Sequence, residues 1–133
     1  MKVNQRSCLL SLSDALVRII EDEIGRAKVD TSGGAVLNFR DPDYSAEEGG
    51  YHPVELAVTS DGQLLYITDF SYAGMPPYAE LVKELDFDFD IETCQQFDHL
   101  FRLKQAGGLF ALWQRNFVSY YQMGVYTVTV GAL

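Results

Sequence analysis

The chain has 133 residues, a size typical of one domain with a single hydrophobic core. Apolar residues make up 47% of it, which argues against an intrinsically disordered chain. Acidic residues outnumber lysine and arginine by 19 to 10, giving a net charge of −9. The chain therefore lacks the basic surface with which proteins bind nucleic acids or anionic membranes directly.

The negative charge is concentrated in the middle of the sequence. Residues 1–40 hold five acidic and six basic residues, and residues 93–133 hold one acidic and three basic residues. Residues 41–92 hold thirteen acidic residues and one lysine, so this segment alone carries a net charge of −12. We therefore expect the middle of the chain to provide the surface that meets a positively charged partner.

The first predicted element is a helix over residues 13–27. Ser13 is a suitable N-cap because its hydroxyl can accept from a free backbone N–H of the first turn. Apolar residues then recur at helical spacing at Leu16, Ile19, Ile20 and Ile24.

The N-terminal segment contains no recognisable targeting or membrane sequence. Its longest apolar run spans residues 8–10, whereas a signal peptide needs a core of about 7–15 apolar residues. No segment reaches the ~18 apolar residues of a membrane helix. We therefore expect a cytoplasmic protein that does not enter membranes and whose two cysteines, Cys8 and Cys94, are free thiols.

A block of strands is predicted after the first helix. The Asp61-Gly62 turn joins two of these strands as an antiparallel hairpin. In the second strand of this hairpin, strict alternation predicts one shared face for Leu64, Tyr66, Thr68, Phe70 and Tyr72. The strands of this block are predicted over residues 35–40, 54–59 and 63–72.

The remaining elements complete an α+β fold. Residues 80–90 end as a strand, while their first half fits either a helical turn or a strand, and residues 95–104 fit either strand or helix. A helix follows Gly107-Gly108 and ends at Gly124, and residues 125–130 form a last strand. We predict a single domain, 1–133, with one twisted antiparallel sheet, an N-terminal helix, a helix near the C-terminus and a final strand after it.

The acidic residues of the middle segment are the predicted partner-binding residues. Two stretches that resemble calcium-binding EF-hand loops, starting at residues 41 and 86, lack the required Gly at position 6 and Glu at position 12. In a regular strand, Asp86, Asp88 and Asp90 would project from one face about 7 Å apart. The predicted partner-binding residues are Asp41, Asp43, Glu47, Glu48, Glu84, Asp86, Asp88 and Asp90.

The two histidines offer weaker evidence for a site. His52 and His99 lie on different predicted elements, and no cysteine or aspartate stands at metal-ligand spacing from either. We place His52 in a candidate pocket, paired with Glu55 or a loop carboxylate. No nucleophile elbow, P-loop, zinc-protease or dinucleotide motif is present. We therefore assign no catalytic residue, and we expect no cofactor and no metal.

The second predicted helix is unusually aromatic. Its apolar arc is wider than one packing face needs, and aromatic residues are enriched at protein interfaces. We therefore expect part of this arc to lie in a homo-oligomer interface. The residues concerned are Phe110, Trp113, Phe117 and Tyr121.

Four segments resemble a known bacterial family: residues 38–55 (NFRDPDYSAEEGGYHPVE), 66–74 (YITDFSYAG), 80–89 (ELVKELDFDF) and 113–130 (WQRNFVSYYQMGVYTVTV). This family is the domain of unknown function number 2787, found in Vibrio and related gamma-proteobacteria, sometimes on mobile or pathogenicity islands. The resemblance implies no established activity. It implies a fold similar to that of an acidic mitochondrial matrix protein that binds the globular heads of complement and forms oligomers.

Three functions are compatible with these observations. The leading hypothesis is a non-enzymatic acidic interaction protein that binds a basic protein partner. The first alternative is a DNA mimic whose carboxylates are spaced like phosphates. The second is a small metal-dependent or hydrolytic enzyme that uses His52 with Asp41, Asp43 or Glu55, and it requires a pocket that holds His52 beside a buried carboxylate.

Overall fold

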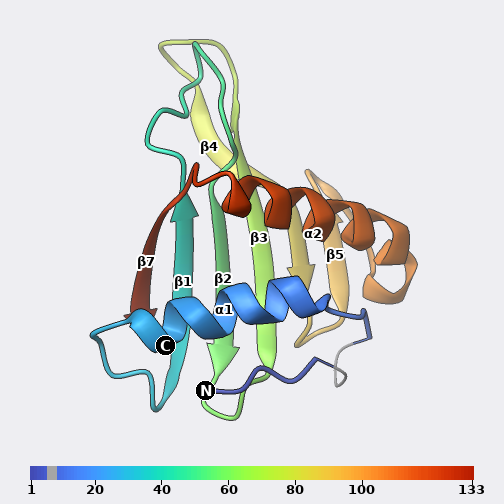
Figure 1. Ribbon diagram of the computed structural model, residues 1–133. Helices are drawn as coiled ribbons and strands as arrows, with labels where there is room; N and C mark the ends of the chain where they lie inside the picture. Colours follow the sequence, from blue (N-terminus) through green and yellow to red (C-terminus); the bar gives the residue numbers. More distant parts are fainter. Residues whose placement is uncertain (6–8) are drawn as a thin grey trace.

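The chain folds into one antiparallel sheet with helices packed on it (Figure 1). The computed structural model describes residues 1–5 and 9–133. Its helices are α1 (Asp14–Arg26), α2 (Gly107–Gln122) and a short 3-10 helix, η1 (Leu103–Ala106). Its strands are β1 (Gly34–Arg40), β2 (Val54–Thr59), β3 (Leu64–Ala73), β4 (Glu80–Asp88), β5 (Thr93–Gln96), β6 (His99–Arg102) and β7 (Thr127–Ala132).

The strand order is β6-β5-β4-β3-β2-β1-β7, with every neighbouring pair antiparallel. The final strand, β7, follows α2 and pairs with β1, so it forms the edge of the sheet opposite β6. This arrangement confirms the predicted α+β class and the strand after the last helix.

Both α-helices lie on the same face of the sheet (Figure 1). Gln114 of α2 joins them, since its Oε1 accepts from the backbone N–H of Ser13 at 3.0 Å and its Nε2 donates to the carbonyl of Ser11 at 3.1 Å. The opposite face of the sheet carries no α-helix within the described residues.

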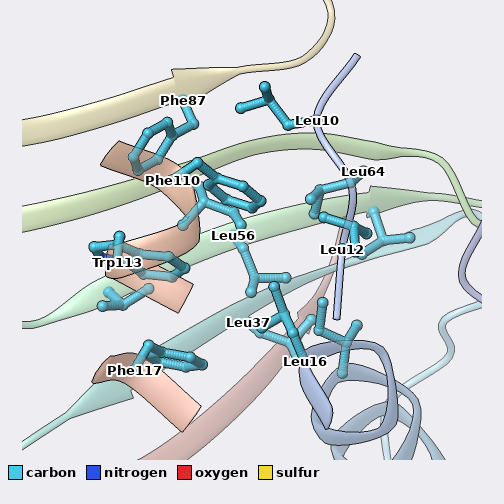
Figure 2. Close-up of a cluster of buried hydrophobic side chains, with 14 of the residues drawn as sticks. Leu10, Leu12, Leu16, Leu37, Leu56, Leu64, Phe87, Phe110, Trp113 and Phe117 are labelled. Carbon is cyan, nitrogen blue, oxygen red and sulfur yellow. The ribbon is translucent and has the colours of Figure 1, made fainter. Parts of the chain in front are cut away.

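The hydrophobic core fills the space between the helices and the covered face of the sheet (Figure 2). Leu37, Leu56 and Phe87 come from three strands and are fully buried. Leu16 of α1 and Phe110 of α2 pack against them from the helix side. Burial of each such side chain stabilises the fold by about 1.5–3 kcal/mol, so this layer fixes the position of α2 over the sheet.

The predicted N-terminal helix is confirmed. Ser13 is its N-cap, and the Ser13 hydroxyl accepts from the backbone N–H of Leu16 at 3.1 Å. The residues predicted to form the apolar stripe, Leu16, Ile19, Ile20 and Ile24, are its buried residues.

The two segments left open by the sequence are now resolved. Residues 80–88 are strand throughout, because β4 pairs along its whole length with β3. Residues 95–104 are not a single strand or a single helix, because they contain the end of β5, all of β6 and the start of η1. The β5–β6 hairpin turns at Phe97, whose φ is 53°, and η1 follows directly.

Two β-bulges interrupt the regular alternation of β3 and β4. Val58 pairs with Leu64 and Ala57 with Tyr66, so Leu65 is an extra residue in β3. The alternation changes phase there, and Leu64 and Ile67 are both buried in the core. The predicted shared face is therefore wrong for Leu64, which lies on the other side of the bulge from Tyr66 and the residues after it.

The second bulge lies between β3 and β4. Leu85 pairs with Asp69 and Lys83 pairs with Phe70, so Glu84 is the extra residue opposite β3. A bulge of this kind re-aims a side chain that regular pairing would place on the other face. It brings Glu84 to the covered face beside Asp69, where both line the same pocket.

Two further sequence expectations concern the cysteines and membranes. Cys94 is buried with a free thiol, and burial raises its pKa to about 11, whereas Cys8 lies outside the described residues. In residues 1–5 and 9–133, neither α-helix is both long and apolar enough to cross a bilayer.

Candidate functional site

A pocket of about 360 Å³ lies between α2 and the covered face of the sheet. Apolar and aromatic residues of α2, with Asn116, form one wall together with Tyr126, while the charged groups come from the segment before β2 and from β3 and β4. No lysine or arginine of the described chain lines it. The polar group at its base is formed by His52, Asp69 and Glu84, which we call the His52 cluster.

His52 is brought to the cluster by the start of β2. Pro53 follows it and favours an extended backbone at residue 52. The carbonyl of Pro53 accepts from the N–H of Phe70 at 2.9 Å, which aligns this segment with the end of β3. His52 Nδ1 then lies 2.8 Å from Asp69 Oδ1 and 3.5 Å from Glu84 Oε2.

Asp69 is a charged residue in an almost fully buried position, with 8% of its surface exposed. Its second carboxylate oxygen, Oδ2, accepts from the indole N–H of Trp113 at 2.9 Å. Buried carboxylates are costly unless their oxygens are hydrogen-bonded. Trp113 and His52 satisfy one oxygen each and thereby fix the orientation of the carboxylate.

Trp113 is itself held rigidly by its neighbours in α2 and the sheet. Its ring stacks on Phe117 at a centroid distance of 5.0 Å and lies 5.9 Å from the ring of Phe87. Figure 2 shows it in line with Phe110 and Phe117 along one side of α2. The helix therefore sets the position of the indole N–H that Asp69 requires.

The electrostatics of the cluster favour a protonated histidine. The hydrogen bond to Asp69 raises the pKa of His52 above its usual 6.5, and the negative charges of Asp69 and Glu84 act in the same direction. Partial burial of the ring acts the opposite way, but the net shift is upward. The cluster thus attracts positive charge.

The donor atoms of the three side chains all lie within 4.8 Å of one another. Two carboxylates at that separation repel each other unless a cation lies between them. The arrangement can hold a proton on His52, a metal ion, or a cationic group that enters from the pocket. It also resembles a general-base pair, in which Asp69 would orient the imidazole of His52.

The structure places His52 in a pocket, beside Asp69 and not beside Glu55. Glu55 lies on the uncovered face of the sheet, where its carboxylate accepts from the hydroxyl of Tyr66 at 2.5 Å. The partner is Asp69, which the sequence had not singled out. Glu84 had been grouped with the partner-binding acids, but the bulge directs it into the pocket.

The acids of residues 41–50 lie at the protruding end of the molecule. This end consists of residues 41–50 and 72–80, which extend together beyond the helices at the top of Figure 1. Tyr44 joins the two segments, since it stacks on Tyr72 and its hydroxyl accepts from the N–H of Tyr72 at 3.0 Å.

Within the protruding end the acids have different roles. Asp43, Glu47 and Glu48 are exposed. Asp41 instead stabilises the loop, because its two carboxylate oxygens accept from the N–H groups of Asp43 at 2.9 Å and Tyr51 at 3.0 Å.

Asp86, Asp88 and Asp90 do not form a continuous row of free carboxylates. Asp86 accepts from the hydroxyl of Thr68 at 2.7 Å and lies 3.8 Å from the ammonium group of Lys83. Asp88 caps the turn after β4 by accepting from the N–H groups of Asp90 and Ile91 at 3.0 Å. Asp90 lies in that turn and is exposed.

The aromatic residues of α2 mainly build the protein's own core. Phe110, Trp113 and Phe117 are 1%, 7% and 2% exposed, so their rings face the sheet and offer almost no surface to a second subunit. Tyr121 is half-buried, and its hydroxyl donates to Glu23 at 3.0 Å and accepts from Arg26 at 3.0 Å. The wide apolar arc is explained by contacts with β1 and β4.

Comparisons with known proteins place the chain in a family. The profile of a family described as proteins of unknown function, DUF2787, matches residues 14–131. No curated protein matches the chain.

Two solved structures are similar over nearly the whole chain. A hypothetical protein from the VSP-II pathogenicity island of Vibrio cholerae is 34% identical, with a TM-score of 0.84 over 97% of this chain and 100% of that one. A conserved hypothetical protein from the VPI-2 island of Vibrio cholerae is 31% identical, with a TM-score of 0.79 over 95% and 98% of the two chains. The latter is described as sharing structural homology with the human P32 protein. The chain therefore belongs to the DUF2787 family of proteins of unknown function.

Proposed function

We propose that the protein is an interaction protein that binds a basic protein partner through its protruding end. The observation that carries this proposal is the combination of exposed apolar and acidic side chains on that end. Met75 is 79% exposed and Tyr78 is 85% exposed. Tyrosine and methionine are enriched at protein interfaces, and large apolar side chains exposed together mark such surfaces.

The charge of the protruding end supports a basic partner. Exposed carboxylates lie on the same protruding end as Met75 and Tyr78, and residues 41–82 contain no lysine or arginine. Acidic groups around an apolar patch attract a basic surface over distance and orient it as it docks. The exposed carboxylates of this end are Asp43, Glu47, Glu48 and Glu80.

The same geometry favours a protein partner over mimicry of DNA. A DNA mimic needs a regular row of carboxylates along one face. Here Glu84 turns to the opposite face from Asp86, and Asp88 caps a turn. An irregular acidic surface with exposed aromatic residues is better suited to a protein surface.

The test compares three variants in affinity capture from a bacterial lysate, followed by mass spectrometry. One variant carries Met75→Ser with Tyr78→Ser, and a second carries Glu47→Gln with Glu48→Gln. The control, Ile91→Ser with Asp98→Asn, changes an exposed apolar residue and an exposed acid outside the protruding end, in the turn after β4 and in the β5–β6 turn. We expect the wild type and the control to retain a basic protein at low salt. The two variants of the protruding end should lose it, and so should the wild type at high salt.

The proposal would be contradicted if the control and the two variants of the protruding end captured the same proteins in the same amounts. Capture that does not weaken with salt would also contradict it. Circular dichroism of each variant checks that the substitutions, all at exposed positions, leave the fold intact.

A second candidate function rests on the pair formed by His52 and Asp69. An oriented histidine in a pocket is the minimal arrangement for general-base hydrolysis. This candidate predicts slow hydrolysis of an activated ester such as p-nitrophenyl acetate, lost in His52→Gln and kept in His99→Gln. Equal rates in the two variants would remove it.

A further inference from the structure

We propose that His52, Asp69 and Glu84 bind one divalent transition-metal ion in the pocket beneath α2, with Zn²⁺ as the best fit. This site is separate from the protruding end, so it does not depend on the proposed function. The three ligands come from three different elements, and each is aimed by its own local structure: the Pro53 segment, β3 and the bulge of β4.

The separations of the donor atoms are close to those of a coordination shell. Two ligands bound to Zn²⁺ at about 2.0–2.1 Å in tetrahedral geometry lie roughly 3.3 Å apart. His52 Nδ1 lies 2.8 Å from Asp69 Oδ1 and 3.5 Å from Glu84 Oε2. All three donor atoms lie within 4.8 Å of one another. The His52 side chain is 35% exposed and that of Glu84 is 28% exposed, so both have room to move toward an ion.

Trp113 supplies the outer contact that metal-binding carboxylates commonly have. Its indole N–H holds Asp69 Oδ2, so Oδ1 stays directed at His52 and Glu84. Such outer hydrogen bonds orient a ligand before the metal arrives and are typical of metal centres. Asp69 is 8% exposed, which keeps competing water away from this ligand.

The composition of the cluster favours Zn²⁺ over other common ions. Imidazole nitrogen and carboxylate oxygen are both ligands that Zn²⁺ accepts, and catalytic zinc sites bind through three protein ligands and leave a fourth position open. That position would face the pocket, which has room for water or a small ligand. Ca²⁺ needs six to eight oxygen ligands, and Mg²⁺ favours all-oxygen octahedral shells, so a histidine with two carboxylates suits neither.

The first test is calorimetric titration of Zn²⁺ into the full chain after treatment with a chelator. We expect one bound ion per chain, with the affinity lowered at least about tenfold in His52→Gln and in Glu84→Gln. The matched controls are His99→Gln, which changes the other histidine, and Glu55→Gln, which removes a carboxylate from the uncovered face. Neither control should change the affinity.

Absence of stoichiometric binding by the wild type would overturn the inference, and so would an equal loss of affinity in the controls. Anomalous diffraction from a crystal soaked in Zn²⁺ gives an answer that needs no variant. It should show a single strong peak between His52 and the two carboxylates, whereas a peak confined to other side chains would contradict the assignment.

Discussion

Asp69 is the residue on which the candidate site depends. It is a nearly buried carboxylate, and its two oxygens are held by an indole from α2 and an imidazole from the segment before β2. Removing the indole or the imidazole leaves one carboxylate oxygen of Asp69 without a hydrogen-bond partner in a poorly solvated place. The folded state then loses more stability than the hydrogen bond alone contributed.

The first prediction concerns Trp113→Phe. This change keeps an aromatic ring against Phe87 and Phe117 but removes the N–H that binds Asp69. We expect the free energy of unfolding to fall by about 2 kcal/mol, measured by urea denaturation. A double-mutant cycle with Asp69→Asn should reveal strong coupling between the two positions, whereas additive effects would contradict the proposed role of the hydrogen bond.

The second prediction concerns the pH dependence of stability. Because the pKa of His52 is raised above 6.5 in the folded state, the folded protein holds the proton more tightly than the unfolded chain. The protonated His52 therefore contributes its full stabilisation of the folded state below about pH 6.5. This contribution is lost as the pH rises through the pKa of His52 in the folded protein. The stability difference between wild type and His52→Gln should be larger at about pH 5.5 than at about pH 8.5.

Urea unfolding of chelator-treated protein at the two pH values measures this difference directly. His99→Gln is the control, because His99 is exposed and lies outside the cluster. A difference between wild type and His52→Gln that grows with pH would reverse the sign and refute the argument.

At the scale of single elements, the sequence predicted the features that repeat with a regular period. Ser13 and the apolar residues of α1 repeat at helical spacing, and the order of strands and helices is set by alternation and turn residues. Leu65 and Glu84 broke the prediction, because a bulge adds one residue without any distinctive residue type. The bulge at Glu84 directs its carboxylate to the covered face beside Asp69, so the sequence grouped Glu84 with the partner-binding acids and did not reveal the His52 cluster.

The hairpin of β5 and β6 shows a similar limit. Two four-residue strands and a 3-10 turn are too short for either period to emerge in the sequence. The pairing of β5 with β4 decides where this hairpin lies, and that pairing is a tertiary contact that no local pattern reveals.

The third prediction tests how α2 is docked on α1. Gln114 uses both ends of its amide to hold the backbone just before α1. Gln114→Ala should lower the free energy of unfolding by about 1 kcal/mol, despite the higher helix propensity of alanine. Gln122→Ala, at the exposed end of the same helix, should be neutral or slightly stabilising. Equal urea midpoints for the two variants would show that Gln114 contributes nothing to docking.

At the scale of the whole molecule, the excess negative charge separates into distinct places. The segment with a net charge of −12 supplies exposed acids to the protruding end and two carboxylates to the pocket. It also supplies Asp88, which caps the turn after β4. The sequence located this charge correctly along the chain. It did not show that residues 41–50 and 72–80 meet, because Tyr44 and Tyr72 are 28 residues apart and their contact depends on the length of the β3–β4 hairpin.

The proposed function is tested most directly by NMR mapping on the labelled protein. The probe is a synthetic peptide rich in arginine and tryptophan, which combines the positive charge and the apolar surface expected of the partner. We predict chemical-shift changes confined to residues 43–48 and 72–80 that weaken as salt is added. Changes centred instead on Glu55 and Asp86 of the uncovered sheet face, or changes unaffected by salt, would contradict the proposal that the protruding end binds a basic partner.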